Sequence, residues 1–466
     1  MPVSLIMVGD GWSGGLVDGW RGVARFGFDK THRCGGRYRM SEAKSATRSL
    51  EFLLLGGTLL FYIAVTLLAN RPDLIWDEGR YLWFAKNLTQ GFYVTPEKPD
   101  LINGPGYPLV LAGLLLVKMP LLGLRLFNAV FMALAAWFSF RAVLPYAGKR
   151  WALGVALVSA LHPSLVRTAP YLMSEALSIG CIAGFAWAFT AALRAEKARW
   201  SLVLAAAFAL GWLTLSRVFF GNVIMASIGF LVLLLPFWKS QRGVLMRALA
   251  VLALAFVMCV PWLAYTKAKT GDTLCWSTNG GELLYWATST HEGENGHWFS
   301  EEDAQNKPEI VANGHRDFYQ ANYYLPVKER EAALKKKALE NIRANPKGVL
   351  KNWLSNWGRL IFGVPRSYQA EELITLVLVA VNGPLVLAVL IALWVGWRYR
   401  GTLPAEILIL ALMTFIYLGG TSLLPGLPRY TIIVWPWIGL GLATILSRHL
   451  KVSLSPPPLS SKFRFI

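Results

Sequence analysis

Charged residues are scarce in this chain of 466 residues. Asp, Glu, Lys and Arg make up only 16% of it, whereas hydrophobic residues make up 55%. Soluble globular proteins usually contain about a quarter charged residues, so the composition excludes an ordinary soluble domain. The apolar runs are continuous rather than alternating, which favours spanning helices over a β-barrel. We therefore expect an all-α integral membrane protein that crosses the bilayer many times.

Cysteine and the common cofactor motifs are also lacking. The four cysteines are Cys34, Cys181, Cys259 and Cys275. Two of them lie inside apolar runs, so neither a disulfide framework nor a CxxC metal site is predicted. There is no Walker-type P-loop and no Rossmann glycine fingerprint, which argues against a nucleotide cofactor.

No metal-binding spacing of histidines is present either. The sequence contains no HExxH motif, and His291, His297 and His315 share one polar stretch without paired spacing. We interpret this stretch as a solvated loop and predict no metal site. No cofactor is predicted, although a divalent metal is left open.

Long apolar runs are what the chain does have. About 20 apolar residues span a bilayer as a helix. Candidate spans lie at about 50–70, 124–145, 152–168, 175–193, 200–216, 218–238, 245–265, 374–396, 404–424 and 430–447.

The net charge of +19 would suggest a nucleic-acid partner in a soluble protein. Here the basic clusters occupy alternate short connections between the spans, such as 149–150, 194–199 and 239–247. The positive-inside rule places such clusters in the cytoplasm, with both termini inside and about ten spans. We expect membrane lipids as partners and no nucleic acid.

This topology divides the chain into five parts. We expect a cytoplasmic, disordered tail, an N-terminal transmembrane catalytic module with a first outer loop at 71–123, a periplasmic subdomain, C-terminal transmembrane helices and a second cytoplasmic tail. These parts are 1–48, 49–265, 266–373, 374–448 and 449–466. Either Met1 or Met40 could be the initiator. Within the first outer loop, "YPLVLAGLLLVKMPLLG" is short for a span and is expected to lie at the outer interface.

Charged residues gather at the outer ends of the spans. Ionisable residues at such depths usually face a bundle interior or a wet cavity and mark functional sites. They are Asp77, Glu78 and Arg80 after the first span, Glu175 in "YLMSEALSIG", Arg217 in "LTLSRVFFGN", and Arg429 with Tyr430 in "LPGLPRYTIIVWP".

Simpler interpretations exist for each of these residues. Asp77 could N-cap a helix at 78–89 that ends at Gly91, and Ser174 could cap the helix that begins at Glu175. A lone Arg at a span end is usually an interface residue with its charge in the headgroups. Taken together, carboxylates and guanidiniums on one face suit an anionic, lipid-linked substrate.

A sugar on a polyprenyl phosphate already carries its leaving group. Transfer then needs a carboxylate as general base for the acceptor hydroxyl and cations for the departing phosphate. These are the residue types that the outer ends supply.

The motifs resemble those of the GT-C glycosyltransferases, the group of protein O-mannosyltransferases and lipid A aminoarabinose transferases (family 39-like). "WDEGRYLWFAKNLTQG" looks like the first outer loop of that family. "YLMSEAL", "LTLSRVF", "PWLAYTKAKTGDTLCWSTNGGELLYW" and "GLPRYTIIVWPW" follow in the family's order, so the resemblance runs from about 50 to about 447.

The resemblance implies a GT-C fold with juxtamembrane helices in the first outer loop. It implies a polyprenyl-phosphate sugar donor, an inverting transfer to a lipid, glycan or protein hydroxyl, and a periplasm-facing site in a bacterial inner membrane. The implied catalytic residues are Asp77, Glu78 and Glu175; those for the donor phosphate are Arg80, Arg217 and Arg429; those for substrate are Tyr81, Tyr107, Asn279, Gly280 and Tyr430.

One departure from the family pattern concerns the first outer loop. Many relatives carry a Lys before the Pro of this loop, whereas "INGPGYPL" has Gly104 before Pro105. That Lys would be a natural phosphate ligand, so another cation must replace it or the donor is held differently.

The segment "STNGGELLYW" at 277–286 has two readings. Asn279 and Gly280 form a turn signal after a span. They could also offer amide and backbone groups to sugar hydroxyls.

Two other functions remain as alternatives. A secondary transporter would place its ionisable residues near the midplane and show repeated halves. An O-antigen ligase or polymerase would also use polyprenyl-linked sugars. The ordered acidic motifs at span ends favour the GT-C transferase.

Overall fold

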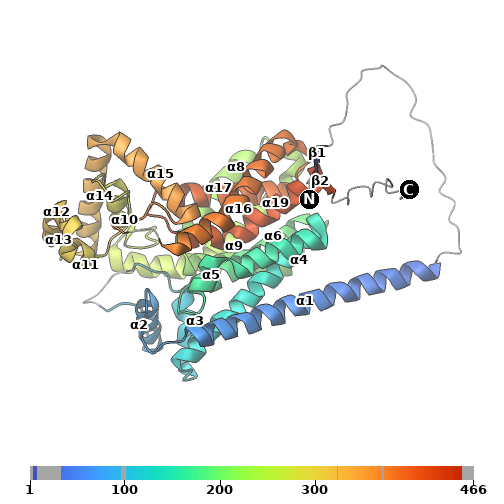
Figure 1. Cartoon of the computed structure of the whole chain (residues 1–466), viewed down its shortest axis with the longest axis horizontal. Coiled ribbons are helices and arrows are strands. Elements are labelled where there is room, and N and C mark those ends of the chain that lie inside the picture. The colour runs from blue at the N-terminus through green and yellow to red at the C-terminus, as the bar shows by residue number, and fades with distance from the viewer. Residues whose placement is uncertain (1–3, 8–32, 96–100, 323, 370–371, 454–466) are drawn as a thin grey trace, which may run out of the picture.

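The computed structural model describes residues 4–7, 33–95, 101–322, 324–369 and 372–453 of the chain. Helices dominate these ranges (Figure 1). Strands β1 (Ser4–Met7) and β2 (Leu450–Ser453) pair antiparallel, in register from Ser4 opposite Ser453. The predicted α-helical class is therefore confirmed, with one short ribbon that the sequence did not predict.

The N-terminal part of the chain contains nine helices in the described residues. The first helix includes residues 33–48, which were expected to be disordered tail, whereas its membrane-span stretch begins at Thr47, close to the expected position. The helices are α1 (Arg33–Ala69), α2 (Glu78–Thr89), α3 (Gly106–Leu116), α4 (Leu121–Leu161), α5 (Pro163–Thr168), α6 (Glu175–Arg194), α7 (Trp200–Ser216), α8 (Phe220–Leu234) and α9 (Arg242–Thr270), with a 3₁₀ turn η2 (Lys239–Gln241) before α9.

The outer subdomain and the C-terminal helices follow. The subdomain contains α10 (Gly280–Thr288), α11 (Glu301–Asn306), α12 (Pro308–Ala312), α13 (His315–Asn322), α14 (Val327–Ala344) and α15 (Pro346–Phe362). The remaining elements are α16 (Leu373–Arg398), the 3₁₀ turn η3 (Arg400–Thr402), α17 (Ala405–Ser422), α18 (Pro428–Ile433) and α19 (Trp435–His449).

Helices occur at all ten expected span positions. Six stretches of the described chain are long and apolar enough to cross a membrane: 47–69, 121–168, 175–194, 239–270, 373–398 and 405–422. One of these stretches covers two expected spans, because α4 continues through a kink at Gly148, whose φ is 77°. The last expected span is broken into α18 and α19. Pro436 lies in the first turn of α19, where its missing N–H costs little.

Helix α3 is the apolar piece of the first outer loop. Its 11 residues reach only about 17 Å, too short for a hydrocarbon core of about 30 Å. It packs beside α2 and α7, and Figure 1 shows α2 and α3 together at one end of the bundle.

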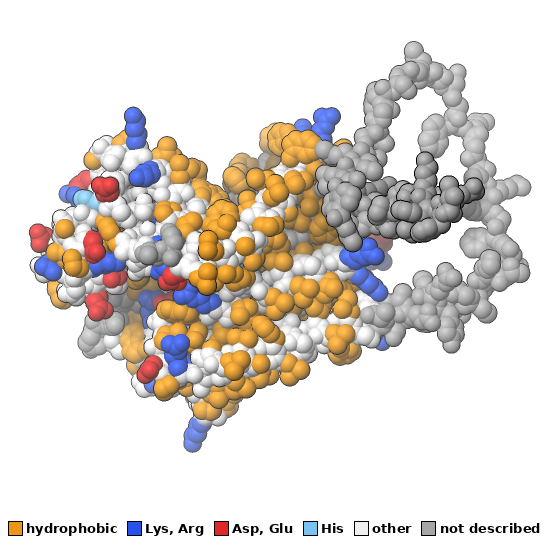
Figure 2. Space-filling model, in the orientation of Figure 1, with side chains coloured by type: hydrophobic (Ala, Val, Ile, Leu, Met, Phe, Trp, Pro, Cys, Tyr) orange, Lys and Arg blue, Asp and Glu red, His pale blue; other side chains and the backbone are white. Residues whose placement is uncertain are grey.

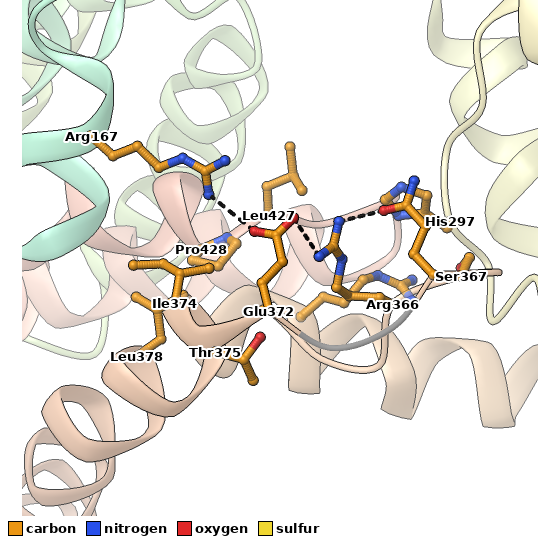
Figure 3. A pocket seen from close by; sticks show the side chains of 13 residues that line it. Arg167, His297, Arg366, Ser367, Glu372, Ile374, Thr375, Leu378, Leu427 and Pro428 are labelled. Atoms are coloured by element: carbon orange, nitrogen blue, oxygen red, sulfur yellow. Dashed lines mark hydrogen bonds and ion pairs between the residues drawn. The ribbon is translucent and has the colours of Figure 1, made fainter. Parts of the chain in front are cut away.

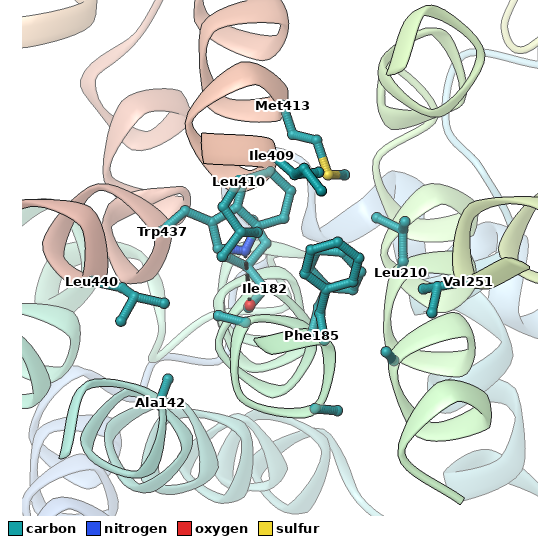
Figure 4. Close-up of a cluster of buried hydrophobic side chains, with 14 of the residues drawn as sticks. Ala142, Ile182, Phe185, Leu210, Val251, Ile409, Leu410, Met413, Trp437 and Leu440 are labelled. Atoms are coloured by element: carbon teal, nitrogen blue, oxygen red, sulfur yellow. Dashed lines mark hydrogen bonds between the residues drawn. The ribbon is translucent and has the colours of Figure 1, made fainter. Parts of the chain in front are cut away.

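Helix α6 lies at the centre of the bundle. In α6, 78% of the most apolar window is buried, against 11% in α16. Gly180 and Gly184 allow this, since a Cβ on Gly180 would lie 3.2 Å from the carbonyl oxygen of Phe131 in α4. Small residues let membrane helices approach closely, where packing contacts replace the hydrophobic effect as the stabilising force. Phe185 of α6 packs in the large core cluster, where Trp437 donates to the Ile182 carbonyl at 3.0 Å (Figure 4).

The basic connections meet at the end of the bundle opposite α2. Arg247 Nη1 donates to the Ala192 carbonyl at 3.1 Å, and the Arg194 guanidinium lies 5.1 Å from the ring centre of Tyr146. The ribbon of β1 and β2 lies at this end, while α10–α14 lie at the other (Figure 1). Between them the surface is largely apolar (Figure 2).

Candidate functional site

The adjacent carboxylates Asp77 and Glu78 point in different directions. They follow Trp76, whose φ of 51° is unusual for a residue with a large side chain. Asp77 precedes the first residue of α2, and consecutive helical residues project about 100° apart. One carboxylate therefore faces the outer surface and the other faces the interior.

Glu78 lies in a fully buried ion pair with Arg125 of α4. Both side chains are 0% exposed, and Arg125 Nε and Nη2 donate to the two carboxylate oxygens at 2.9 and 2.8 Å. The backbone N–H groups of Ile75 and Leu172 donate to the same oxygens at 3.0 and 2.8 Å. Each oxygen of Glu78 thus accepts two hydrogen bonds, so the Glu78 carboxylate has a structural role.

Arg125 is equally saturated. Besides Glu78, it donates to Asn70 Oδ1 at 3.1 Å and to the carbonyls of Arg71 and Asp73 at 2.5 and 3.0 Å. These bonds use all five guanidinium N–H groups. We call Glu78 and Arg125 the closed pair. Sequence reasoning overlooked Arg125, although an Arg inside the apolar run "LLGLRLFNAV" is itself a signal.

Asp77 lies in a different and more open environment. Its side chain makes no capping bond to α2, so the N-cap reading of this residue is wrong. Instead Arg80 Nη2 lies 2.5 Å from Asp77 Oδ1, and Arg429 Nη2 lies 3.7 Å from Oδ2. Asp77 is 29% exposed. Arg80 thus holds one oxygen, while the other makes only a long contact.

Glu175 joins Asp77 to two span ends that are distant in sequence. It is the first residue of α6, and its side chain is 1% exposed. Arg217, directly after α7, lies 2.6 Å from Glu175 Oε1, and Arg429 of α18 lies 3.3 Å from the same oxygen. Arg429 therefore bridges the two carboxylates. We call Asp77, Arg80, Glu175, Arg217 and Arg429 the open cluster.

The open cluster has unused hydrogen-bonding capacity. The Nε atoms of Arg80, Arg217 and Arg429 are buried without a hydrogen-bond partner in the described part of the chain, as is Glu175 Oε2. Three guanidiniums face two carboxylates, which leaves one positive charge. Buried polar groups are normally satisfied, so these orphaned donors indicate a place for an anionic ligand.

Three tyrosines that the resemblance pointed to lie at or behind the cluster. The ring centre of Tyr430 lies 5.4 Å from the Arg217 guanidinium and 5.6 Å from that of Arg429. Tyr81 donates to Ser174 Oγ at 3.0 Å, and burial raises its pKa. Ser174 makes no capping bond to α6, so its cap reading is also wrong.

Tyr107 lies one layer deeper. It packs edge-to-face on Tyr81 with ring centres 5.2 Å apart, and it donates to Asn128 Oδ1 at 3.1 Å. Only 1% of it is exposed. The structure places it behind the cluster, where it supports Tyr81.

Gly104 has a packing reason to be glycine. A Cβ there would lie 2.1 Å from the carbonyl oxygen of Leu215, and one on Gly106 would lie 2.4 Å from Ser216 Oγ. The first outer loop thus crosses the end of α7 at backbone contact, directly before Arg217. A Lys at this position would force the two segments apart.

Asn279 and Gly280 lie at the start of the outer subdomain. Asn279 accepts from Ser277 Oγ at 2.9 Å and precedes α10, in which the N–H of Gly281 donates to Glu331 Oε2 at 2.6 Å. Thr278 bonds to Leu101 of the first outer loop. Gly280 and Gly281 are helical residues of α10, so the turn reading is wrong at these positions, and the sugar-contact reading stays a prediction.

No group of three or more His, Cys, Asp or Glu side chains among the described residues is arranged to hold an ion.

No protein-family model matches the chain, and no curated protein matches it. Solved structures that match include the oligosaccharyltransferase AglB from Archaeoglobus fulgidus, in complex with an inhibitory peptide and a dolichol-phosphate (14% identity, TM-score 0.47, covering 86% of this chain and 50% of that one). Another is the Archaeoglobus fulgidus oligosaccharyltransferase in complex with Zn and sulfate (15%, 0.48, 84% and 48%). A third is ArnT from Cupriavidus metallidurans bound to undecaprenyl phosphate (16%, 0.38, 85% and 76%).

The chain spans about half the length of the two oligosaccharyltransferases.

Proposed function

We propose that this chain is a membrane glycosyltransferase of the GT-C type, which moves a sugar from a polyprenyl-phosphate donor to an acceptor hydroxyl. The observation that carries the proposal is the open cluster. It brings Asp77, Glu175, Arg217 and Arg429 together at one end of the bundle from four segments that are distant in sequence. The acceptor is a lipid, a glycan or a protein.

The donor phosphate binds to the guanidiniums of Arg217 and Arg429, with Arg80 at the edge. Arginines give charge-assisted, often bidentate bonds to phosphate oxygens, and these strengthen as the leaving group gains charge. Glu175 holds Arg217 and Arg429 in place through one oxygen. Its nearly complete burial fixes that geometry before the donor arrives.

Asp77 is the general base. Its Oδ2 has only the 3.7 Å contact to Arg429, whereas Oδ1 is held by Arg80. The acceptor oxygen attacks the anomeric carbon as its proton passes to Asp77, and the bond from that carbon to the phosphate oxygen breaks. A single displacement of this kind inverts the anomeric configuration, and polyprenyl phosphate leaves.

The site faces the periplasm of a bacterial inner membrane. The basic connections lie at the opposite end of the bundle, and such connections remain in the cytoplasm. Charged residues near span ends rather than the midplane also favour a transferase over a transporter.

Donor binding by the purified chain tests this assignment. Replacing both Arg217 and Arg429 by Gln should weaken binding of a polyprenyl-phosphate sugar about tenfold or more, because each charge-assisted bond contributes roughly 1.5–3 kcal/mol. The wild-type affinity should also fall with added salt. Arg343→Gln, at an exposed position of α14, is the matched control and should bind like wild type. An unchanged donor affinity in the double variant would contradict the phosphate role.

A further inference from the structure

A second cationic site lies where the outer subdomain meets the C-terminal helices. A cavity of about 270 Å³ is lined by Arg167, His297, Arg359, Arg366 and Glu372, with Leu378, Leu427 and Pro428 on its apolar side (Figure 3). We call it the basic pocket. It shares no lining residue with the open cluster.

Arg359 of α15 is the unusual residue of this pocket. Only 2% of it is exposed, yet no carboxylate pairs with it in the described part of the chain. Its Nη2 donates to the Gly296 carbonyl at 3.0 Å and to Asn356 Oδ1, while Nε and Nη1 have no hydrogen-bond partner there. Burying a charge without a counter-ion is costly, so this guanidinium lacks an anion.

The other charges of the pocket do not supply that anion. Glu372 lies 2.6 Å from Arg366 and 4.0 Å from Arg167, so its carboxylate is already engaged (Figure 3). Three arginines against one glutamate leave two positive charges among the described lining residues. His297 also has a buried Nδ1 without a partner in these residues.

An apolar groove adjoins the basic pocket. It encloses about 450 Å³ between α16, α17, α18 and α19, and Pro428 lines both spaces. Its lining extends from Pro428 to Ile445, and Leu360, next to Arg359, is part of its wall. Leu393 and Phe415, 63% and 76% exposed, lie at its rim. The groove thus opens to the bilayer side of the bundle.

We propose that the basic pocket and the apolar groove together bind a diacyl membrane lipid through its phosphate headgroup. The phosphate binds Arg359 Nε and Nη1, and an acyl chain lies along the groove between α16 and α19. A soluble anion would not need the groove, and a neutral lipid would leave Arg359 unpaired. This site does not depend on the proposed transfer reaction, and it is separate from the donor phosphate at Arg217 and Arg429.

Binding of phosphatidylglycerol to the purified full-length chain tests the proposal, with phosphatidylcholine, a polyprenyl phosphate and inorganic phosphate as competitors. Arg359→Gln should weaken phosphatidylglycerol binding about tenfold. Glu372→Gln should strengthen it about threefold, because the competing carboxylate is removed from a half-exposed ion pair. The second variant keeps the test decisive if the buried Arg359 variant does not fold.

A substitution that places a larger side chain in the apolar groove tests whether the lipid binds there. Gly441 of α19 lines the groove, and a Cβ there meets no atom within 4 Å, so Gly441→Leu should occupy groove space and weaken binding at least fivefold. Gly383→Leu on α16 is the matched control, since it is equally unhindered and is not among the groove-lining residues. Its affinity should equal that of wild type.

The proposal is overturned if Gly441→Leu and Glu372→Gln both bind phosphatidylglycerol like wild type. It is also overturned if inorganic phosphate or phosphatidylcholine competes as well as phosphatidylglycerol does. If a polyprenyl phosphate displaces the lipid, and Arg359→Gln weakens binding of both molecules equally, the pocket belongs to the donor and the proposal fails.

Discussion

Asp77 and Glu78 are consecutive residues, yet their carboxylates belong to two different ion-pair arrangements. The closed pair of Glu78 and Arg125 is 0% exposed, and every donor and acceptor in it is used. The open cluster around Asp77 is partly exposed and contains orphaned guanidinium nitrogens. Charge at a membrane interface thus serves structure where it is saturated and is available for a ligand where it is not.

The closed pair also explains how the open cluster is held. Arg125 ties α4 to the carbonyls of Arg71 and Asp73, and Glu78 binds the N–H of Leu172. These contacts fix the start of α2 and the approach to α6. Asp77 directly precedes α2 and Glu175 begins α6. The closed pair therefore brings these two carboxylates to one site.

Removing the Asp77 carboxylate is the change with the largest expected effect on activity. Asp77→Asn should lower the rate of sugar transfer about 10²- to 10⁴-fold, the usual contribution of a general base. The melting temperature should stay near the wild-type value, because the carboxylate is partly exposed and makes no capping bond. Transfer assays and thermal unfolding of the same sample measure both quantities.

The closed pair should respond in the opposite way. Glu78→Gln should cost about 3–5 kcal/mol of unfolding free energy, because it leaves the buried Arg125 charge without its counter-ion. Adding Arg125→Gln should restore part of that loss. Glu51→Gln, which breaks a partly exposed pair with Arg141, is the control and should cost about 1 kcal/mol or less. Equal losses in Glu78→Gln and the control would contradict the structural role.

The first outer loop offers a smaller perturbation of the open cluster. Gly104→Lys should destabilise the protein by about 1–3 kcal/mol, since its Cβ would press on the Leu215 carbonyl beside Arg217. Gly113→Ala in α3, with open space around it, is the control and should be neutral or stabilising. If Gly104→Lys kept its melting temperature and bound donor more tightly, the loop would be free to accommodate a phosphate ligand there.

Two histidines of the outer subdomain allow a similar comparison between a saturated and an unsaturated polar group, with pH as the variable. His315 bonds Tyr285 at 2.5 Å and Glu294 at 2.8 Å, whereas His297 Nδ1 has no partner in the described residues. Burial, followed by the charge of Arg359, lowers the pKa of His297 to about 4. The unfolded chain has a His pKa of about 6.5, so it takes up the proton first as the pH falls.

Stability should therefore decline as the pH falls from about 6.5 to 4. His297→Gln should flatten this part of the pH profile of the melting temperature, while His315→Gln should lower the melting temperature at every pH. An unchanged slope in His297→Gln would contradict a buried, neutral imidazole.

Much of this architecture could be predicted from the sequence, because apolar length and the placement of Lys and Arg are local signals. Helix α2 was expected at 78–89 and is found there. The positions of Glu175, Arg217 and Arg429 at span ends also followed from the apolar runs. The sequence could predict that these residues lie on the same side of the membrane, but it could not predict which of them contact one another.

The split between Asp77 and Glu78 could not be predicted, since it depends on where α4 places Arg125. A contact over 47 residues leaves no periodic trace in the local sequence. The requirement for glycine at position 104 could not be predicted either, because it arises where the first outer loop crosses the end of α7.

The central claim is that two neighbouring carboxylates have separate roles, one in chemistry and one in structure. The most direct test measures the single-turnover rate of sugar transfer in Asp77→Asn and Glu78→Gln under the same conditions. The donor is saturating, and the rate is expressed per folded molecule. The account predicts that Asp77→Asn loses transfer about 10²-fold or more while Glu78→Gln retains most of it. Equal losses per folded molecule, or full transfer by Asp77→Asn, would contradict it.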